Sequence, residues 1–367
     1  MKLLCTFISS RTFLSNPVKN ILPLSLNCKF SALSSDAVQV KRKNSSDYSF
    51  ESNVVRLQQE STEFSWEASK TVVHCHYKNG LGSLPVEVNV YDNGLGDDAP
   101  TVVMLLGLSG SGEDFKDMVA SLSSAGIRCV APEIPGFGDS VISRSDIYRL
   151  DFTSIGQSQM LTDILKKKKI ARIDSVVSHS AASWLAVHFG SSHQSVKSLF
   201  LINPLSIRPN KAMRPYIWTK LVGATARKEM LWPVADSYIN TGARRSGFKI
   251  PPHKHRQMYV SLETVSTVDF NLVMENVKTI QSKRLPAMVA WSKKDKMIEE
   301  PLTRQLVGLL GLRNEIPVTG QPTKGCQYPF TKELVFENGG HALHKKEAKF
   351  LSENIILMLR HILYSNK

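Results

Sequence analysis

Three residues of the types that activate a nucleophilic hydroxyl occur along the chain in the order Ser180, Asp295 and His341. A serine hydroxyl is a weak nucleophile near neutral pH unless a histidine accepts its proton and an acid orients that histidine. We therefore predict that Ser180 is a nucleophile, that His341 is its general base and that Asp295 orients the base.

Ser180 is chosen over its neighbours because of the residues that flank it in the stretch SHSAA. A nucleophile on a sharp strand-to-helix turn needs small residues two positions before and after it. Ser178 and Ala182 meet this requirement for Ser180, whereas Val176 would flank Ser178 and Leu185 would flank Ser183. The alternative is a serine-rich turn with no catalytic role.

A glycine-rich loop, GLSGSG, follows the apolar run TVVMLL and begins at Gly107. Backbone N–H groups of such a loop can bind the negative oxygen of an acyl-transfer intermediate. We predict that Leu108 and Ala181 supply these N–H groups. Gly107, Ser109 and His179 are further candidates for contact with the substrate. The loop lacks the G-K-[ST] sequence of a phosphate loop.

Continuous apolar runs of strand length alternate with amphipathic stretches over most of the chain. A hairpin over 70–77 and 84–92 precedes the buried strands predicted at 101–107, 127–134, 173–178, 196–203, 286–292 and 332–337. Alternation of this kind predicts a mostly parallel sheet with helices on both faces. Functional groups gather at the carboxyl ends of the strands in such sheets, and Ser180, Asp295 and His341 each follow a predicted strand.

The alternation of strands and helices stops at about residue 205 and resumes at 286. We therefore predict a core of residues 70–205 and 286–367, interrupted by a helical cap over 206–285. Residues 44–69 are interpreted as a linker or a peripheral helix. Residues 1–43 are interpreted as a targeting or disordered segment outside the fold.

The basic residues of the chain are concentrated in two of these segments. Residues 1–43 carry seven Lys or Arg and one acid, a composition typical of a mitochondrial transit peptide. A disordered cytosolic tail and a secretory signal are the alternatives. Residues 206–285 carry fourteen Lys or Arg against five acids.

The basic cap suggests contact with an anionic acyl substrate or with a membrane surface. Arg208, Lys211 and Arg214 follow a predicted strand end, and aromatic residues such as Trp218 could line an acyl pocket. A solvated basic face and packing between cap helices are the alternatives.

Other functional classes are disfavoured by what the sequence lacks. No apolar run approaches the ~20 residues of a membrane-spanning helix. The five cysteines are scattered, and none forms a CxxC pair. We expect no metal, no cofactor and no nucleic-acid partner. The oligomeric state is not predicted.

Several of these stretches together resemble the α/β-hydrolase family over roughly residues 70–367. They are LLGLSGSGEDF, APEIPGFGDS, SHSAA, KKDKMIEE and GGHALHKKEA. The segments GIRCVAPEIPGFG and NPLSIRPNKAMRP are most similar to invertebrate α/β hydrolases of unknown function. The sequence departs from the family pattern at two points: no histidine precedes Gly107, and the serine turn has no glycine.

The resemblance implies a Ser-His-Asp hydrolase with a cap. Family members that hydrolyse epoxides or haloalkanes use an aspartate nucleophile, so Ser180 favours an ester, thioester or amide of a small or lipid-like acyl substrate. An acyltransferase or a carbon–carbon bond hydrolase would need the same residues. A catalytically silent binding protein is the alternative from another class, suggested by the two departures.

Overall fold

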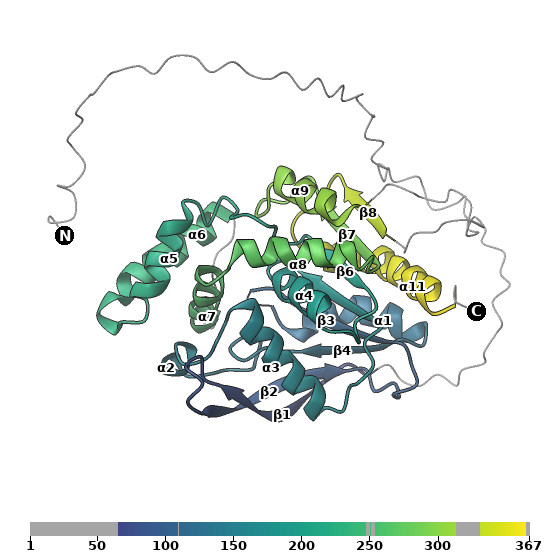
Figure 1. The fold of residues 1–367 in the computed structure, drawn as a ribbon, viewed down its shortest axis with the longest axis horizontal. Coiled ribbons are helices and arrows are strands. Elements are labelled where there is room, and N and C mark those ends of the chain that lie inside the picture. Colours follow the sequence, from purple (N-terminus) through teal and green to yellow (C-terminus); the bar gives the residue numbers. More distant parts are fainter. Residues whose placement is uncertain (1–64, 109, 247–249, 251–253, 313–330, 365–367) are drawn as a thin grey trace, which may run out of the picture. The chain divides into compact units, whose positions relative to one another are not determined.

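An eight-stranded sheet runs through the described part of the chain in the order β1-β2-β4-β3-β5-β6-β7-β8 (Figure 1). The computed structural model describes residues 65–108, 110–246, 250, 254–312 and 331–364. The strands are β1 (Glu67–His76), β2 (Ser83–Asp92), β3 (Thr101–Leu105), β4 (Arg128–Pro132), β5 (Ser175–His179), β6 (Leu199–Ile202), β7 (Ala287–Ser292) and β8 (Thr331–Phe336). Strands β1 and β2 are antiparallel to their neighbours, and β3 to β8 are parallel. The predicted hairpin and mostly parallel sheet are confirmed.

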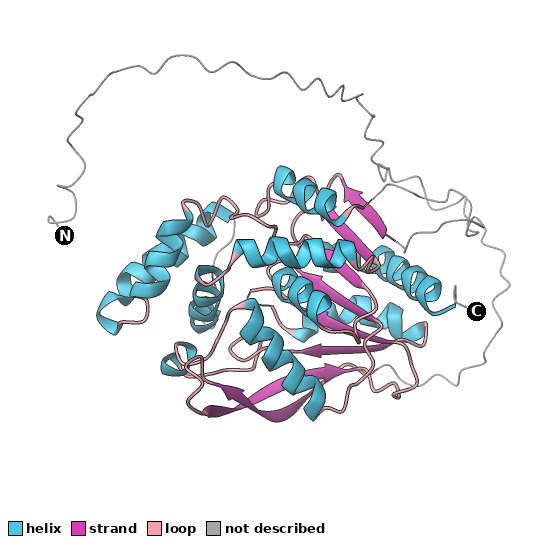
Figure 2. Cartoon of the chain, viewed as in Figure 1, coloured by secondary structure: helices cyan, strands magenta, loops and turns pink. Residues whose placement is uncertain are grey.

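Helices cover both faces of the sheet, as Figure 2 shows. The helices are α1 (Lys116–Ser124), α2 (Arg144–Ile147), α3 (Ser154–Lys167), α4 (Ala182–Ser192), α5 (Tyr216–Thr225), α6 (Trp232–Ser246), α7 (His255–Ser266), α8 (Phe270–Ser282), α9 (Glu300–Leu310), α10 (Leu343–Lys346) and α11 (Ala348–Tyr364). Two short 3-10 segments, η1 (Gly112–Phe115) and η2 (Glu229–Leu231), precede α1 and α6. Helices α3, α4, α8 and α9 pack in sequence along one face, and α1 packs against α11 on the other.

Strand β3 shows why the sheet is buried on both sides. Val102 and Met104 belong to the apolar cluster under α1 and α11, whereas Val103 and Leu105 belong to the cluster under α3 and α4. Alternate side chains of a strand point to opposite faces, so a strand between two helical layers needs apolar residues at every position. The continuous apolar runs in the sequence have this origin.

The segment predicted as a cap, 206–285, separates into two parts. Helix α7 packs against α5 and α5 against α6, whereas α8 packs against α4 and α9. Helix α8 is therefore one of the helices that cover the sheet. We call α5, α6 and α7 the helical excursion, which leaves the sheet after β6 and returns through α8.

The start of the core differs from the predicted boundary at residue 70. Strand β1 begins at Glu67 and pairs with β2 along its full length, and Trp66 is buried against Tyr91. The polar stretch EASK resembles a linker because this edge strand has an exposed face. The expectations for residues 1–43 and 44–64 lie outside the described residues. Among the residues that are described, no helix is long and apolar enough to cross a membrane.

Candidate active site

Ser180 occupies a tight turn between strand β5, which ends at His179, and helix α4, which begins at Ala182. Its backbone φ is 57°, in the left-handed region that non-glycine residues rarely adopt. Backbone strain of this kind persists where the surrounding structure holds the residue in place. The turn therefore has the shape of a nucleophile elbow without a glycine on either side.

The three serines of this stretch have different surroundings. Ser178 is fully buried, and its hydroxyl has no hydrogen-bond partner among the described residues. The Ser183 hydroxyl donates to the Leu205 carbonyl oxygen at 2.9 Å. The Ser180 Oγ lies 2.9 Å from His341 Nε2. Among the three, Ser180 alone has its hydroxyl directed at a histidine.

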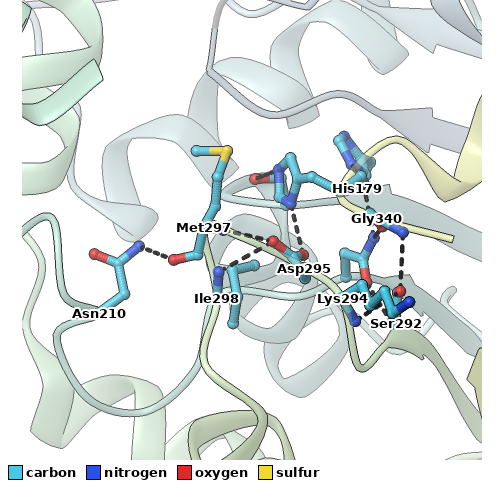
Figure 3. Close-up of polar contacts among 11 residues, drawn as sticks. His179, Asn210, Ser292, Lys294, Asp295, Met297, Ile298 and Gly340 are labelled. Atoms are coloured by element: carbon cyan, nitrogen blue, oxygen red, sulfur yellow. Dashed lines mark hydrogen bonds and ion pairs between the residues drawn. The ribbon is translucent and has the colours of Figure 1, made fainter. Parts of the chain in front are cut away.

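His341 also contacts Asp295, so the three side chains predicted from the sequence lie together. His341 Nδ1 is 2.7 Å from Asp295 Oδ2, and the Asp295 side chain is only 3% exposed. The other carboxylate oxygen of Asp295 accepts hydrogen bonds from the backbone N–H groups of Met297 and Ile298 (Figure 3). A carboxylate held on both oxygens fixes the ring of His341. With Nδ1 donating to the carboxylate, Nε2 is left to accept from the Ser180 hydroxyl.

The backbone that carries His341 is held by side chains from three strand ends. Asn203 Nδ2 donates to the carbonyl oxygens of Gly340 and His341, at 2.9 and 2.7 Å. His179 Nε2 lies 2.9 Å from the same His341 oxygen and donates to it. The Ser292 hydroxyl accepts from the Gly340 N–H at 2.9 Å. Figure 3 shows His179, Ser292 and Gly340 around this loop.

Asn203 is a site residue that the sequence interpretation missed. It follows β6 directly, at the same edge of the sheet as Ser180 and Asp295. The available signal was therefore the same as for the predicted residues: a polar side chain at the carboxyl end of a buried strand.

Two further histidine rings lie beside His341. The ring centroid of His179 is 4.8 Å from that of His341 and 4.0 Å from that of His344. Burial lowers the pKa of His344 to about 4, and burial lowers the pKa of His179 well below its ordinary value, helped by the nearby His344. Both rings are neutral near neutral pH. They therefore place no fixed positive charge against His341.

The glycine-rich loop lies against the serine turn. A Cβ on Gly107 would be 2.9 Å from Ser180 Cβ and 3.1 Å from the Ala181 backbone nitrogen, so only glycine fits there. The backbone N–H groups of Leu108 and Ala181 donate to no acceptor among the described residues. No backbone acceptor among those residues therefore competes with a substrate oxygen for these two groups. Ser109, predicted to contact substrate, lies outside the described residues.

A cavity of about 610 Å³ adjoins the Ser180 and His341 side chains. Gly107, Leu108 and His179, three of the residues proposed from the sequence to meet the substrate, also line it. The helical excursion and its flanks supply mostly apolar lining: Leu205, Met213, Tyr238, Ile239, Ala243, Ile250, Met258, Leu262 and Val265. The charged lining comes from Asp114, Lys294, Lys296 and Lys345. Pockets of roughly 300–1,000 Å³ with apolar walls hold small organic ligands.

Two residues predicted to contact the substrate, Trp218 and Arg214, do not line this cavity. Trp218 is 58% exposed and does not line the cavity, because α5 turns Thr219 inward instead. Arg214 is also absent from the lining and forms an ion pair with Glu299. Of the other basic residues predicted near the mouth, Arg208 is exposed and does not line the cavity. The basic side chains that do line the cavity are those of Lys294, Lys296 and Lys345.

Solved structures with similar folds carry different activities in their names. A putative lipase from Acinetobacter baumannii has a TM-score of 0.56 and 16% identity, covering 82% of this chain and 93% of that chain. The thioesterase domain from the curacin biosynthetic pathway has a TM-score of 0.52 and 17% identity, covering 80% and 99%. Haloalkane dehalogenase DbeA from Bradyrhizobium elkani has a TM-score of 0.57 and 12% identity, covering 82% and 100%. At such identities the likeness shows the fold alone.

No curated protein matches the chain. A family model described as alpha/beta hydrolase of unknown function (DUF1057) matches residues 82–309, which is more than half of the sequence. This match spans β3, β5 and β7 with the turn that holds Ser180 and the loop that holds Asp295. The chain belongs to this family of α/β hydrolases of unknown function.

Proposed function

We propose that the protein is a serine hydrolase that cleaves an ester, thioester or amide bond of a lipid-like acyl substrate. The observation that carries the proposal is the continuous chain of contacts Ser180–His341–Asp295, at 2.9 and 2.7 Å, at the wall of the apolar cavity. A hydroxyl, a base and an orienting carboxylate in this order are the requirements for nucleophilic acyl transfer.

Each step of the reaction has a group to perform it. Ser180 Oγ attacks the acyl carbon while His341 Nε2 takes the hydroxyl proton. The carbonyl oxygen becomes negative and is bound by the N–H groups of Leu108 and Ala181. When the bond to the leaving group breaks, His341 gives its proton to that group and an acyl-Ser180 ester remains. Water, deprotonated by His341, then attacks the ester and releases the acid and Ser180.

Asp295 serves the reaction without taking the proton. Its carboxylate accepts the Nδ1–H of His341 and stabilises the imidazolium that forms after proton transfer. The neutral rings of His179 and His344 support the same role, because a cation at either position would oppose a positive charge on His341.

The shape and lining of the cavity support an acyl chain as the bound part of the substrate. The walls given by α6 and α7 include Tyr238, Ile239, Met258 and Leu262, whose side chains are aromatic or aliphatic. Burial of an apolar chain there contributes ~25 cal/mol per Å² of area removed from water. Lys294 and Lys296, which flank Asp295 in the sequence, and Lys345 add positive charge to the lining of the cavity.

The left-handed backbone of Ser180 bears on the alternative of a silent binding protein. The absence of elbow glycines suggested that alternative, yet the turn adopts φ 57° with the small residues Ser178 and Ala182 beside it. This geometry supports a working nucleophile. An acyltransferase would use an acceptor other than water to attack the acyl-Ser180 ester. The products of the reaction therefore distinguish it from a hydrolase.

A substrate screen tests the proposal. Esters and thioesters of increasing acyl length are incubated with the purified chain and with Ser180→Ala, and the free acid is quantified. We expect release of acid by the wild-type protein and loss of that release in the variant. Equal release by both proteins would exclude Ser180 chemistry. Transfer of the acyl group to an added alcohol in place of water would identify an acyltransferase.

A further inference from the structure

Large exposed apolar side chains are concentrated on the helical excursion. Among the described residues, ten such side chains are exposed, and five of them lie between positions 217 and 234. We call these five the docking face: Ile217 (60% exposed), Trp218 (58%), Leu221 (47%), Met230 (88%) and Val234 (52%). Apolar residues scattered singly on a surface need no explanation, but a group of this size marks a site of interaction.

The docking face follows from the way α5 is turned. Thr219, Val222 and Gly223 are buried, whereas Ile217, Trp218 and Leu221 share the opposite side at helical spacing. Helices α5 and α6 pack against each other, and Figure 1 shows them beside one another at one edge of the described part. The docking face therefore consists of the outward side of α5 together with Met230 of η2 and Val234 of α6.

Basic residues outnumber acidic ones along the segment that carries the docking face. Between residues 217 and 245 there are five Lys or Arg and two acids. Lys220, Lys228 and Arg245 are exposed and pair with no carboxylate among the described residues. One of the two acids, Asp236, is engaged by the Tyr259 hydroxyl. The local excess of positive charge is therefore free to meet an anionic partner.

The same two helices form a wall of the cavity from their inner sides. Thr219 on α5, and Tyr238, Ile239 and Ala243 on α6, line the cavity that adjoins Ser180. One thin layer of two helices thus separates an exposed apolar and basic face from an apolar cavity.

We infer that the docking face binds the surface of an anionic lipid membrane. Helices that lie in a membrane interface combine Trp, Leu and similar residues on one side with Lys and Arg at the level of the lipid head groups. Both features are present here, and anionic head groups complement the unpaired cations. A second copy of the chain fits the face poorly, because a symmetric contact would set these cations against one another.

Flotation of the full-length Ser180→Ala chain with lipid vesicles tests the inference. This background keeps lipid binding separate from hydrolysis, so failure of the docking face and failure of the proposed function are distinguishable. We expect the chain to bind vesicles of phosphatidylcholine with phosphatidylserine more strongly than phosphatidylcholine alone, with binding weakened by salt. The triple variant Ile217→Ser, Leu221→Ser, Met230→Ser should lower the partition coefficient by roughly tenfold or more.

The matched control replaces three exposed apolar residues elsewhere on the surface: Leu81→Ser, Ile155→Ser and Leu357→Ser. It carries the same basic residues 1–43, so any binding through that segment is equal in both triple variants. We expect the control to bind like the parent, and both triple variants to keep the parent's thermal unfolding midpoint. Equal binding by the two triple variants would overturn the inference.

The position of Trp218 provides a second readout. It is the only exposed tryptophan among the described residues, so vesicle binding should shift its emission to shorter wavelength. Trp218→Phe should keep vesicle binding and lose most of that shift. A shift that persists in Trp218→Phe, or a parent chain that self-associates through the docking face in the absence of lipid, would contradict docking on a membrane.

Discussion

The carboxyl edge of the sheet and the helical excursion supply different things to one cavity. At the sheet edge, Ser180, Asp295 and His341 are joined by short hydrogen bonds, and the loop of His341 is tied down by Asn203. The excursion offers apolar walls and an exposed face but no side chain within hydrogen-bond reach of Ser180 among the described residues. On the proposed function, directional contacts at the sheet edge would hold the reacting groups, and the shape of the excursion would select the substrate.

If the sheet edge carries the chemistry, removal of the proposed base, His341, should lower kcat more than any other change described below. His341→Ala leaves the Ser180 hydroxyl without a proton acceptor, and we expect kcat to fall by roughly a thousandfold or more. The matched change in the excursion, His255→Ala, removes a histidine that does not line the cavity. Its kcat should stay close to that of the wild type. Steady-state kinetics on one soluble ester compare the two variants. Similar losses of kcat in both would show that the sheet edge and the excursion do not differ in their importance for catalysis.

Asn203 tests how far the position of the base matters. Asn203→Ala removes two hydrogen bonds to the backbone of the His341 loop, and small displacements of a catalytic group cost up to ~100-fold in rate. We expect kcat to fall by that order with KM little changed, because Asn203 does not line the cavity.

The control for this prediction is Asn276→Ala, which removes another buried asparagine, bonded to Ser191 and His188 away from the site. It should lower the thermal midpoint and leave kcat near the wild-type value. If Asn203→Ala lowers stability but not kcat, its role is structural only.

Gly242 offers a way to change the excursion without touching the sheet edge. It lines the cavity, and a Cβ placed on it would meet no atom within 4 Å. Gly242→Leu should therefore fill part of the cavity and lower kcat/KM for long-chain esters by about tenfold, while short esters react as before.

Gly308→Leu is the matched control, because Gly308 also lies in a helix with open space around its Cβ position and does not line the cavity. Kinetics over a series of acyl lengths compare the two variants. An unchanged length preference in Gly242→Leu would mean that the acyl chain binds elsewhere.

The last expected effect is on stability: His344 should make the free energy of unfolding depend on pH. The pKa of this buried ring is about 4, against an ordinary value of 6.5 in the unfolded chain. Between these two pH values the unfolded state binds more protons at His344 than the folded state does. The contribution of His344 to the free energy of unfolding is therefore fully present above pH ~6.5 and declines as the pH falls. The loss from about pH 7 to about pH 5 is ~2 kcal/mol for this group alone.

Urea unfolding across that pH range measures the effect. His344→Phe keeps a ring in the same place and removes the titration, so the decline should become shallower; the remaining slope belongs to His179 and other groups. The exposed substitution His76→Phe is the control and should keep the wild-type slope. The same slope in both variants would show that His344 is not buried as a neutral ring.

The two regions also differ in how well the sequence predicts them. Strands β3, β6 and β7 are nearly continuous apolar runs, and β5 and β8 contain shorter ones, so the strand ends are visible in the sequence and the polar residues that follow them are marked. Ser180, Asp295 and His341 were found in this way. Asn203 was not, although it follows β6 directly, because an asparagine before a proline is typical of an ordinary turn.

The excursion lacks such a signal. In α5 the sequence YIWTKLVGAT has apolar residues on every side, so its pattern does not say whether Trp218 or Thr219 faces the cavity. Packing against α6 and α7 decides this, and those contacts join residues far apart in the chain. For the same reason α8 was assigned to the cap although it covers the sheet, and Arg214 was placed near a site that it does not reach.

Covalent labelling with a fluorophosphonate, followed by mass spectrometry of the labelled peptide, tests the central claim most directly. The account predicts a single adduct on Ser180, reduced strongly in His341→Ala and unchanged in Ser178→Ala, since Ser178 is fully buried. An adduct on any other residue, or no adduct on folded wild-type protein, would contradict Ser180 as an activated nucleophile.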